Sequence, residues 1–274
     1  MIQEFLKHIG KNRGYSRNTV EGYERDLQEF VRFMRTERPE ARWSTITAQD
    51  MDAFVTAMAD LGLASATIKR RVAAVRSLFT YMRGQHLVDR NPAQYTSTPK
   101  LAKREPHTIE PAAITATVED RQVSFTTRVQ VALLAETGIR ISELMSLRVE
   151  DVDEQHRQLH ITGKGNKERT VNYGARFAQM WAEYRGNATG QIFIEDVRTA
   201  SRNIHFALAK HSAQRYLSPH IIRHTFATEM VRNGASIYAV KDLLGHESVK
   251  TTEQYAHRCQ SSSAQQYKEF APVV

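Results

Sequence analysis

The chain has 274 residues, a length that fits one or two domains. Apolar residues make up 41% of it and charged residues 25%, and no apolar run approaches the roughly 18 residues of a membrane span, so we expect a soluble protein. The single cysteine, Cys259, excludes an internal disulfide and any site built from several cysteines. Residues 1–5 lack the basic and apolar stretches of a secretory signal, which predicts a cytoplasmic location.

Basic residues are concentrated in the first part of the chain. Residues 1–106 hold 18 Lys and Arg against 12 Asp and Glu, a net charge of +6. Residues 107–274 hold 20 against 18, which brings the total to +8. A strongly basic small domain favours a polyanionic partner such as nucleic acid. The alternative is that the charge serves only solubility.

Four helices are predicted in this first part. Apolar side chains recur at helical spacing in residues 1–11, and Ser16 is a good N-cap for a second helix that ends near Pro39. A third helix is predicted over 48–60, and a fourth begins at Ser65. Together they predict a small helical bundle.

A basic stripe follows the outward side of the fourth predicted helix. The absence of acidic residues from 61–88 favours contact with DNA phosphates over an ordinary solvated helix face. The candidate DNA-binding residues are Lys69, Arg70, Arg71, Arg76 and Arg83.

A linker is predicted at residues 97–106, which contain two prolines and show no periodicity. It separates a first domain at 1–96 from a second domain at 107–274. The second domain is predicted to be helical with one antiparallel hairpin, formed by strands 157–162 and 168–173. Its expected helices span residues 124–136, 141–147, 175–185, 199–211, 219–232, 237–244, 248–257 and 262–270.

Several familiar chemistries are missing from the sequence. It contains no P-loop, no dinucleotide-binding glycine fingerprint and no His-Glu-x-x-His motif. His220 and His224 have a spacing that can hold a metal, but histidines that only donate and accept hydrogen bonds are the better interpretation. No metal site is therefore predicted.

A set of cationic and proton-transferring side chains remains, each near the end of a predicted element. Phosphoryl transfer needs positive donors around the phosphate oxygens, and a guanidinium binds two oxygens while staying charged. Tyrosine, with an ordinary pKa of ~10, is a feasible nucleophile and leaving group. These features together predict a phosphodiester site. Its candidate residues are Arg140, Lys164, His220, Arg223, His246 and Tyr255.

Five segments resemble the tyrosine recombinases, most closely the short Xer-type members and phage integrases. They are Thr137–Leu144 (TGIRISEL), Gly163–Arg169 (GKGNKER), His220–Thr228 (HIIRHTFAT), Leu243–Ser248 (LLGHES) and Thr251–Tyr255 (TTEQY). The resemblance covers nearly the whole chain. It implies a mainly α fold, with a four-helix, SAM-like core-binding domain followed by a helical catalytic domain that carries a small antiparallel sheet.

The resemblance also implies a role for each candidate. Tyr255 would attack the scissile phosphate, which gives a 3′-phosphotyrosyl link and a free 5′-hydroxyl. Arg140 and Arg223 would hold the non-bridging oxygens. Lys164 would protonate the departing 5′-oxygen. The tyrosyl link keeps the energy of the broken bond, so no cofactor or metal is expected.

Three further residues complete the implied site. His220 would act as general base or proton relay for the tyrosine, and His246 would donate a hydrogen bond to the phosphate. Glu143, one helical turn after Arg140, would orient the site without touching DNA.

The resemblance implies double-stranded DNA with two inverted half-sites as the partner, and no membrane. A homo- or hetero-tetramer would assemble on the DNA, with a free monomer as an open alternative in its absence. The chain begins directly at the first core-binding helix, which favours a simple site. The last predicted helix, 262–270, could dock on a neighbouring protomer or on its own domain. The target sequence, the accessory factors and the outcome (integration, excision, inversion or dimer resolution) stay open.

Two other functions fit part of the pattern. A type IB topoisomerase uses the same catalytic groups and would relax DNA. A non-catalytic DNA-binding regulator is the second alternative, because residues 237–257, with Gly245 in the turn, have the outline of a helix-turn-helix. Chain length, the wording of the motifs and the predicted C-terminal docking helix favour recombination over the topoisomerase. The separations of the candidate catalytic residues favour it over the regulator.

Overall fold

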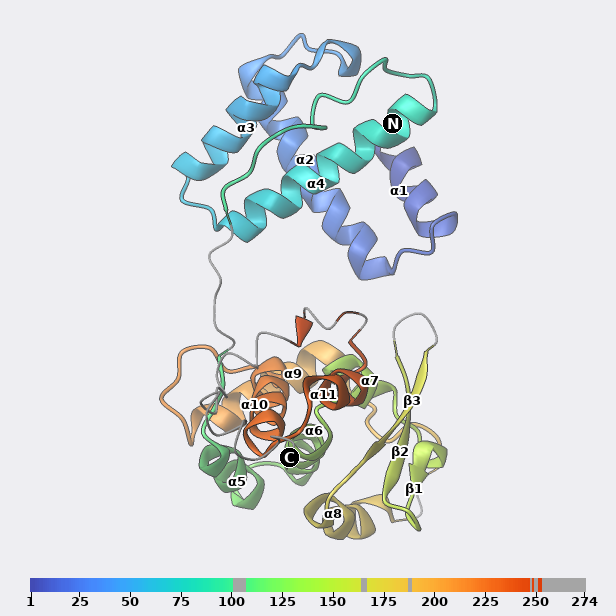
Figure 1. The fold of residues 1–274 in the computed structure, drawn as a ribbon, viewed down its shortest axis with the longest axis vertical. Helices are drawn as coiled ribbons and strands as arrows, with labels where there is room; N and C mark the ends of the chain where they lie inside the picture. Colours follow the sequence, from blue (N-terminus) through green and yellow to red (C-terminus); the bar gives the residue numbers. More distant parts are fainter. Residues whose placement is uncertain (101–106, 164–166, 187–188, 247, 249–250, 253–274) are drawn as a thin grey trace, which may run out of the picture. The chain divides into compact units, whose positions relative to one another are not determined.

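The computed structural model describes residues 1–100, 107–163, 167–186, 189–246, 248 and 251–252. It divides into two compact units, Met1–Lys103 and Arg104–Val274, and each is described by itself (Figure 1). The division falls within the predicted linker, 97–106, part of which lies outside the described residues. The bounds of that linker, and the domain limits drawn from it, stay a prediction.

The N-terminal unit is a bundle of four helices. They are α1 (Ile2–Lys11), α2 (Arg17–Glu37), α3 (Ala48–Asp60) and α4 (Ser65–Gly84), with the 3-10 turn η1 (Trp43–Thr45) before α3. The side chain of Ser16 accepts a hydrogen bond from the Thr19 backbone and so caps α2. Thr47 and Asp50 cap α3 reciprocally.

The core of this unit is built around α4. Ile68, Val75 and Leu78 of α4 are buried among apolar side chains of the other three helices, including Phe30 and Phe54. Burying one side of α4 removes its apolar surface from water and leaves the polar side exposed. The basic stripe predicted on this helix therefore lies away from the core.

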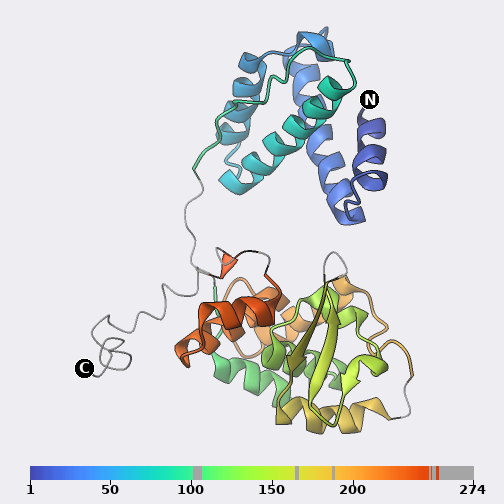
Figure 2. The same ribbon diagram turned by 45° about the vertical axis from the view of Figure 1, so that its right-hand side comes forward.

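The second unit combines helices with a three-stranded antiparallel sheet in the order β1-β2-β3. The helices are α5 (Pro111–Glu119), α6 (Phe125–Thr137), α7 (Ile141–Ser146), α8 (Ala175–Arg185), α9 (Val197–Ala209), α10 (Pro219–Arg232) and α11 (Ile237–Leu244). The strands are β1 (Val152–Asp153), β2 (Gln158–Thr162) and β3 (Glu168–Asn172), and the 3-10 turn η2 (Val149–Asp151) precedes β1. The sheet lies at one side of the helices of this unit in Figure 1 and comes to the front in the turned view (Figure 2).

The predicted elements of this unit recur with small shifts. Helix α9 begins two residues earlier than expected, because the Asp196 side chain accepts hydrogen bonds from the backbone of Arg198 and Thr199. Helix α5 and strand β1 were not predicted: α5 is short and rich in alanine and threonine, and β1 has only two residues. The predicted helix 262–270, and most of 248–257, lie outside the described residues.

Helix α6 is the centre of the second unit. It contacts α5, α8, α9 and α10, and Val129, Leu133 and Leu134 are fully buried. Helix α11 contacts both α10 and β3 (Figure 1). The C-terminal end of α6, the end of α11 and the start of β3 are thereby brought together. Among the described residues, no helix is both long and apolar enough to cross a membrane.

Candidate active site

The site begins where α6 ends. Gly138 adopts the left-handed conformation, with φ at 63°, and its backbone N–H donates to Leu134 of α6. A Cβ at this position would lie 2.4 Å from a ring carbon of Phe226, so a larger residue does not fit. The gap between the predicted helices 124–136 and 141–147 is therefore a tightly packed turn at Gly138, and it places Arg140 at the start of α7.

Glu143 is the buried carboxylate of the site, with its side chain only 5% exposed. Its Oε2 accepts a 2.7 Å hydrogen bond from the Arg140 backbone N–H, and its Oε1 accepts one of 2.9 Å from Arg140 Nη1. An acidic residue three positions into a helix caps the helix N-terminus in this way. Glu143 thus fixes both the backbone and the guanidinium of Arg140.

Arg169, on β3, binds the same carboxylate with two nitrogens. Its Nη1 lies 3.0 Å from Glu143 Oε1 and its Nη2 lies 2.8 Å from Oε2, the paired geometry in which a guanidinium binds a carboxylate most strongly. We did not predict Arg169 as a site residue. The available signal was its position as the last residue of the Gly163–Arg169 segment.

The two arginines determine the charge of Glu143. Burial alone would raise the pKa of this carboxyl, but hydrogen bonds from Arg169 and from the Arg140 backbone outweigh burial and lower the pKa below its ordinary value. Glu143 is therefore a carboxylate at neutral pH and balances part of the positive charge around it.

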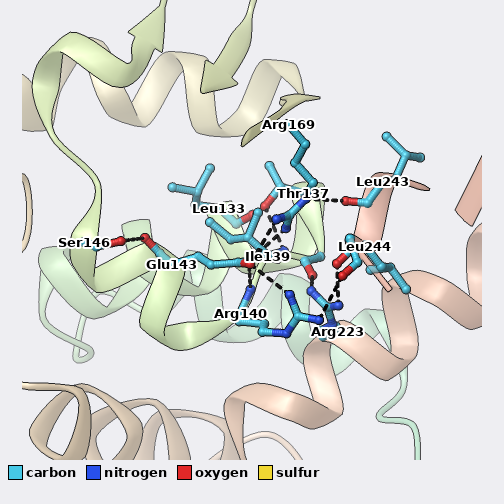
Figure 3. Close-up of polar contacts among 12 residues, drawn as sticks. Leu133, Thr137, Ile139, Arg140, Glu143, Ser146, Arg169, Arg223, Leu243 and Leu244 are labelled. Carbon is cyan, nitrogen blue, oxygen red and sulfur yellow. Dashed lines mark hydrogen bonds and ion pairs between the residues drawn. The ribbon is translucent and has the colours of Figure 1, made fainter. Parts of the chain in front are cut away.

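Three arginine side chains donate hydrogen bonds to three successive carbonyl oxygens at the end of α11 (Figure 3). The pairs are Arg169 with Leu243 at 3.0 Å, Arg223 with Leu244 at 2.7 Å, and Arg140 with Gly245 at 3.2 Å. The last carbonyls of a helix lack partners within the helix and carry the negative end of its dipole, so they attract cations. The end of α11 therefore binds all three arginine side chains in the absence of DNA.

Arg223 is buried on α10, with 4% of the residue exposed, and its Nη1 also donates to the Gly138 carbonyl at 2.6 Å. His220 lies one helical turn earlier on α10. Burial, followed by the positive charges of Arg223 and Arg140, lowers the pKa of His220. Its ring is consequently neutral at pH 7, the form that can accept a proton.

His246 follows the left-handed Gly245 that ends α11. One ring nitrogen, Nδ1, lies 2.9 Å from Oγ1 of Thr252, which is fully buried. Burial, together with Arg223 and Arg140, lowers the pKa of His246 to about 4. A neutral His246 can donate one hydrogen bond without adding charge.

The structure thus brings together five of the predicted residues. They are Arg140, Glu143, His220, Arg223 and His246. Lys164 and Tyr255 lie outside the described residues. Gly163 and Lys167, on either side of Lys164, are joined by a 2.8 Å backbone hydrogen bond.

His220 and His224 have a suitable spacing for a metal, but they do not belong to a larger set of metal-ligating side chains among the described residues. Over the described ranges, no group of three or more His, Cys, Asp or Glu side chains is arranged to hold a metal ion. Burial, with smaller contributions from His220 and Arg223, lowers the pKa of His224 to about 4.

The basic residues of α4 fall into two groups. Lys69, Arg70 and Arg83 are exposed, and Arg70 also forms an ion pair with Asp26, a carboxylate buried on α2. Arg71 is half-buried, with its Nε 3.9 Å from Asp26. Asp26 therefore holds Arg70 and Arg71 on one side of the bundle.

Arg76 has a different environment from the rest of the stripe. It is half-buried, and its guanidinium donates to the carbonyl oxygens of Ala93 at 2.8 Å and Thr96 at 3.3 Å. These contacts tie the segment that follows α4 to the helix. Its guanidinium therefore has a structural task inside the unit, in contrast to the exposed Lys69 and Arg83.

Comparison with known proteins agrees with this fold. Residues 109–261 match the model of the phage integrase family, and residues 2–86 match that of the phage integrase N-terminal SAM-like domain. The protein is a site-specific DNA recombinase of the tyrosine type. The chain belongs to the phage integrase family, which confirms the resemblance and the mainly α, two-part fold class.

The similar curated proteins are Xer recombinases. The chain is 33% identical to tyrosine recombinase XerC of Herpetosiphon aurantiacus, over 93% of this chain and 90% of the relative. It is 31% identical to XerC of Roseiflexus castenholzii over 99% and 93%, and 27% identical to XerD of Oceanobacillus iheyensis over 99% and 98%.

Solved structures share the fold at lower identity. XerH recombinase bound to its difH substrate before cleavage matches with a TM-score of 0.74 and 19% identity, over 100% of this chain and 84% of that one. The Tn1549 transposon integrase in complex with circular intermediate DNA matches with a TM-score of 0.73 and 19% identity, over 98% and 99%.

Proposed function

We propose that the protein cleaves and rejoins double-stranded DNA through Tyr255, with the scissile phosphate held between Arg140 and Arg223. The observation that carries the proposal is the convergence of both guanidiniums on the end of α11, next to His246. Their hydrogen bonds to backbone carbonyls orient them in advance, so little reorganisation is needed when a phosphate arrives.

The proposed reaction has two steps, cleavage and rejoining, and the second reverses the chemistry of the first on another strand. The Tyr255 oxygen attacks phosphorus while the bond to the 5′-oxygen breaks, and Lys164 gives its proton to that oxygen. The products are a 3′-phosphotyrosyl link and a free 5′-hydroxyl. Attack by the 5′-hydroxyl of another strand then restores a phosphodiester and releases Tyr255, so no external energy source is consumed.

The histidines would act as neutral groups in this reaction. Because the pKa of His220 is lowered, its ring is free of a proton at neutral pH and can take the one that leaves Tyr255. His246, with a pKa of about 4, would donate a hydrogen bond to a phosphate oxygen. The positive charge that the developing phosphorane needs then comes from the arginines and Lys164.

The DNA partner in this proposal carries two inverted half-sites, on which a homo- or hetero-tetramer assembles in the cytoplasm. The exposed Lys69 and Arg83 would bind phosphates of the half-site, with Arg70 and Arg71 beside them. The DNA-bound XerH and Tn1549 integrase structures support DNA as the partner by likeness of fold.

A covalent-adduct assay tests the proposal. Purified protein is incubated with nicked duplexes made from the DNA that flanks its own gene, and SDS-stable adducts are mapped by peptide mass. We expect an adduct on Tyr255 that is lost in Tyr255→Phe and kept in Tyr238→Phe, whose ring is on the exposed side of α11. An adduct that survives Tyr255→Phe contradicts the proposal.

The same assay separates recombination from simple relaxation. Two labelled duplexes that carry the trapped site are mixed, and exchange of their arms is followed on a gel. Exchange supports recombination, whereas relaxation of a supercoiled plasmid with a single site and no exchange supports topoisomerase-like chemistry.

A further inference from the structure

We propose that Arg169 is a positioning residue that couples the two halves of the catalytic set. One half is Arg140, on the α6–α7 turn, and the other is His246, at the end of α11. The inference rests on the proposed function of this site and adds to it a residue that acts through Glu143 and through the α11 backbone.

The link to Arg140 passes through a shared carboxylate. Glu143 Oε1 accepts hydrogen bonds from Arg140 Nη1 at 2.9 Å and from Arg169 Nη1 at 3.0 Å, while Oε2 accepts from the Arg140 backbone at 2.7 Å and from Arg169 Nη2 at 2.8 Å. Each carboxylate oxygen therefore accepts one hydrogen bond from Arg140 and one from Arg169. Without the Arg169 fork, the Glu143 side chain could rotate and take Arg140 with it.

The link to His246 passes through the helix end. Arg169 Nε donates to the Leu243 carbonyl at 3.0 Å, three residues before His246. The guanidinium also packs closely on the turn itself, since a Cβ on Gly245 would lie only 3.0 Å from Arg169 Nη1. A single side chain thus binds both the carboxylate that holds Arg140 and the Leu243 carbonyl (Figure 3). Leu243 lies in the last turn of α11, which His246 follows.

Arg169 is built to support the site rather than to touch DNA. All three of its guanidinium nitrogens donate hydrogen bonds inside the protein, and its side chain is 14% exposed. The Arg140 side chain, by contrast, is 32% exposed. A phosphate could reach Arg140, whereas Arg169 has its donors directed to Glu143 and Leu243.

Lysine cannot reproduce this arrangement. Its ammonium is a single point of charge, which can approach either the carboxylate or the carbonyl but cannot present three nitrogens in a planar fork. The inference therefore predicts that charge alone is insufficient at this position.

The test compares full-length Arg169→Gln and Arg169→Lys with the wild type, on the nicked duplex that yields the Tyr255 adduct. We expect DNA affinity within about threefold of wild type, because all three guanidinium nitrogens of Arg169 already donate hydrogen bonds inside the protein. The single-turnover cleavage rate should fall on the order of 10²-fold in Arg169→Gln and by a smaller factor in Arg169→Lys.

Arg128→Gln is the matched control. Arg128 is also half-buried in the second unit and also binds a backbone carbonyl, with its Nε 2.6 Å from Val118 O, but it lies at the α5–α6 junction. Its loss should lower stability without slowing cleavage.

A pH profile distinguishes positioning from a general loss of structure. Protonation of His220 also lowers the cleavage rate at acid pH. Arg169 helps to keep Glu143 ionised, so its removal raises the pKa of that carboxyl and moves the acid limb of the cleavage rate to higher pH than in the wild type. In a Glu143→Gln background, the same Arg169→Gln change should slow cleavage much less than in the wild type.

The outcomes separate this inference from the proposed function. Wild-type protein that cleaves, with Arg169→Gln equally fast and with an unmoved acid limb, overturns the inference alone. Wild-type protein that forms no Tyr255 adduct overturns the proposed function and the inference with it. Should Arg169→Gln not fold, the same rate and pH measurements on Arg169→Lys decide the question.

Discussion

Arg223 and Gly138 are joined by a 2.6 Å hydrogen bond from the guanidinium Nη1 to the backbone carbonyl oxygen. This bond ties α10 to the turn that ends α6, two residues before Arg140. Gly138 therefore supports the site in two ways: its left-handed backbone makes the turn, and its carbonyl holds the buried arginine. Arg140 and Arg223 therefore both depend on the geometry of this one glycine.

Gly138→Ala should destabilise the second unit by about 2–4 kcal/mol, because backbone strain adds to a clash with the Phe226 ring. Unfolding is followed in urea by the fluorescence of Trp181, in a Trp43→Phe background that leaves one tryptophan. Gly234→Ala is the control, since Gly234 also has a positive φ but a Cβ there would meet no atom within 4 Å. Its cost should be about 1–2 kcal/mol, from strain alone. Equal losses in the two variants would contradict the clash.

The turn at Gly138 shows what could be predicted from the sequence. A Thr-Gly break between two apolar helices marks a helix end by local rules, and the caps at Ser16 and Thr47 obey rules of the same kind. Residues such as Arg140 and Arg223 were predicted from their chemistry and from the segments that resemble a family. Local rules alone could not bring them together, because their meeting on α11 joins residues far apart in the chain.

Arg169 and Arg76 show why the rest was not predictable. Arg169 faces Glu143 across 26 residues of sequence, and only the fold, which places β3 beside α11, gives it both of its partners, Glu143 and Leu243. Arg76 has the spacing of an exposed stripe residue, yet the segment at Ala93 folds back over it. Periodicity reports which side of a helix is apolar, and it does not report which chain segment covers the polar side.

Glu143→Gln should slow adduct formation on the order of 10²-fold, and it should lower stability by about 1–3 kcal/mol. The amide keeps one acceptor oxygen, but it turns a donor toward one of the two guanidiniums and removes the negative charge between them. Glu136→Gln is the control. Glu136 is also half-buried and accepts backbone hydrogen bonds from Gly174 and Phe177, but it caps α8 rather than binding arginine. Cleavage at the wild-type rate in Glu143→Gln would show that the carboxylate does not orient the site.

Arg83→Gln should weaken the salt dependence of DNA binding, whereas Arg76→Gln should loosen the segment that follows α4. Arg83 is exposed on α4, so its loss should lower the slope of log affinity against log salt by about 0.9, the value for one phosphate contact, and leave stability unchanged. Arg76→Gln should instead increase hydrogen–deuterium exchange in residues 91–96, which lose the hydrogen bonds to Ala93 and Thr96. Salt titrations by fluorescence anisotropy and exchange on both variants test the pair. A changed salt slope for Arg76→Gln with unaltered exchange would place its guanidinium on DNA instead.

The lowered pKa values of His224 and His246 make the stability of the second unit depend on pH. Each pKa is about 4 in the folded protein, against about 6.5 in an unfolded chain. The unfolded chain therefore binds more protons between these values, so stability is complete above pH 6.5 and falls as the pH drops toward 4. The rings are only partly buried, so solvent screening limits the loss to about 1–2 kcal/mol for each.

Urea unfolding at pH 7.0, 6.0, 5.0 and 4.5, with Trp181 as the reporter, measures this loss, and comparison with His246→Gln cancels the contribution of carboxylates that titrate near pH 4.5 in both proteins. His246→Gln should reduce the difference in unfolding free energy between pH 7.0 and 4.5, because an amide cannot take up the proton that opposes the folded state. His160→Gln, on the exposed side of β2, controls for the substitution itself. A pH dependence that is identical in His246→Gln and wild type would mean that the pKa of His246 is the same in the folded and the unfolded chain, which would contradict its lowering by burial.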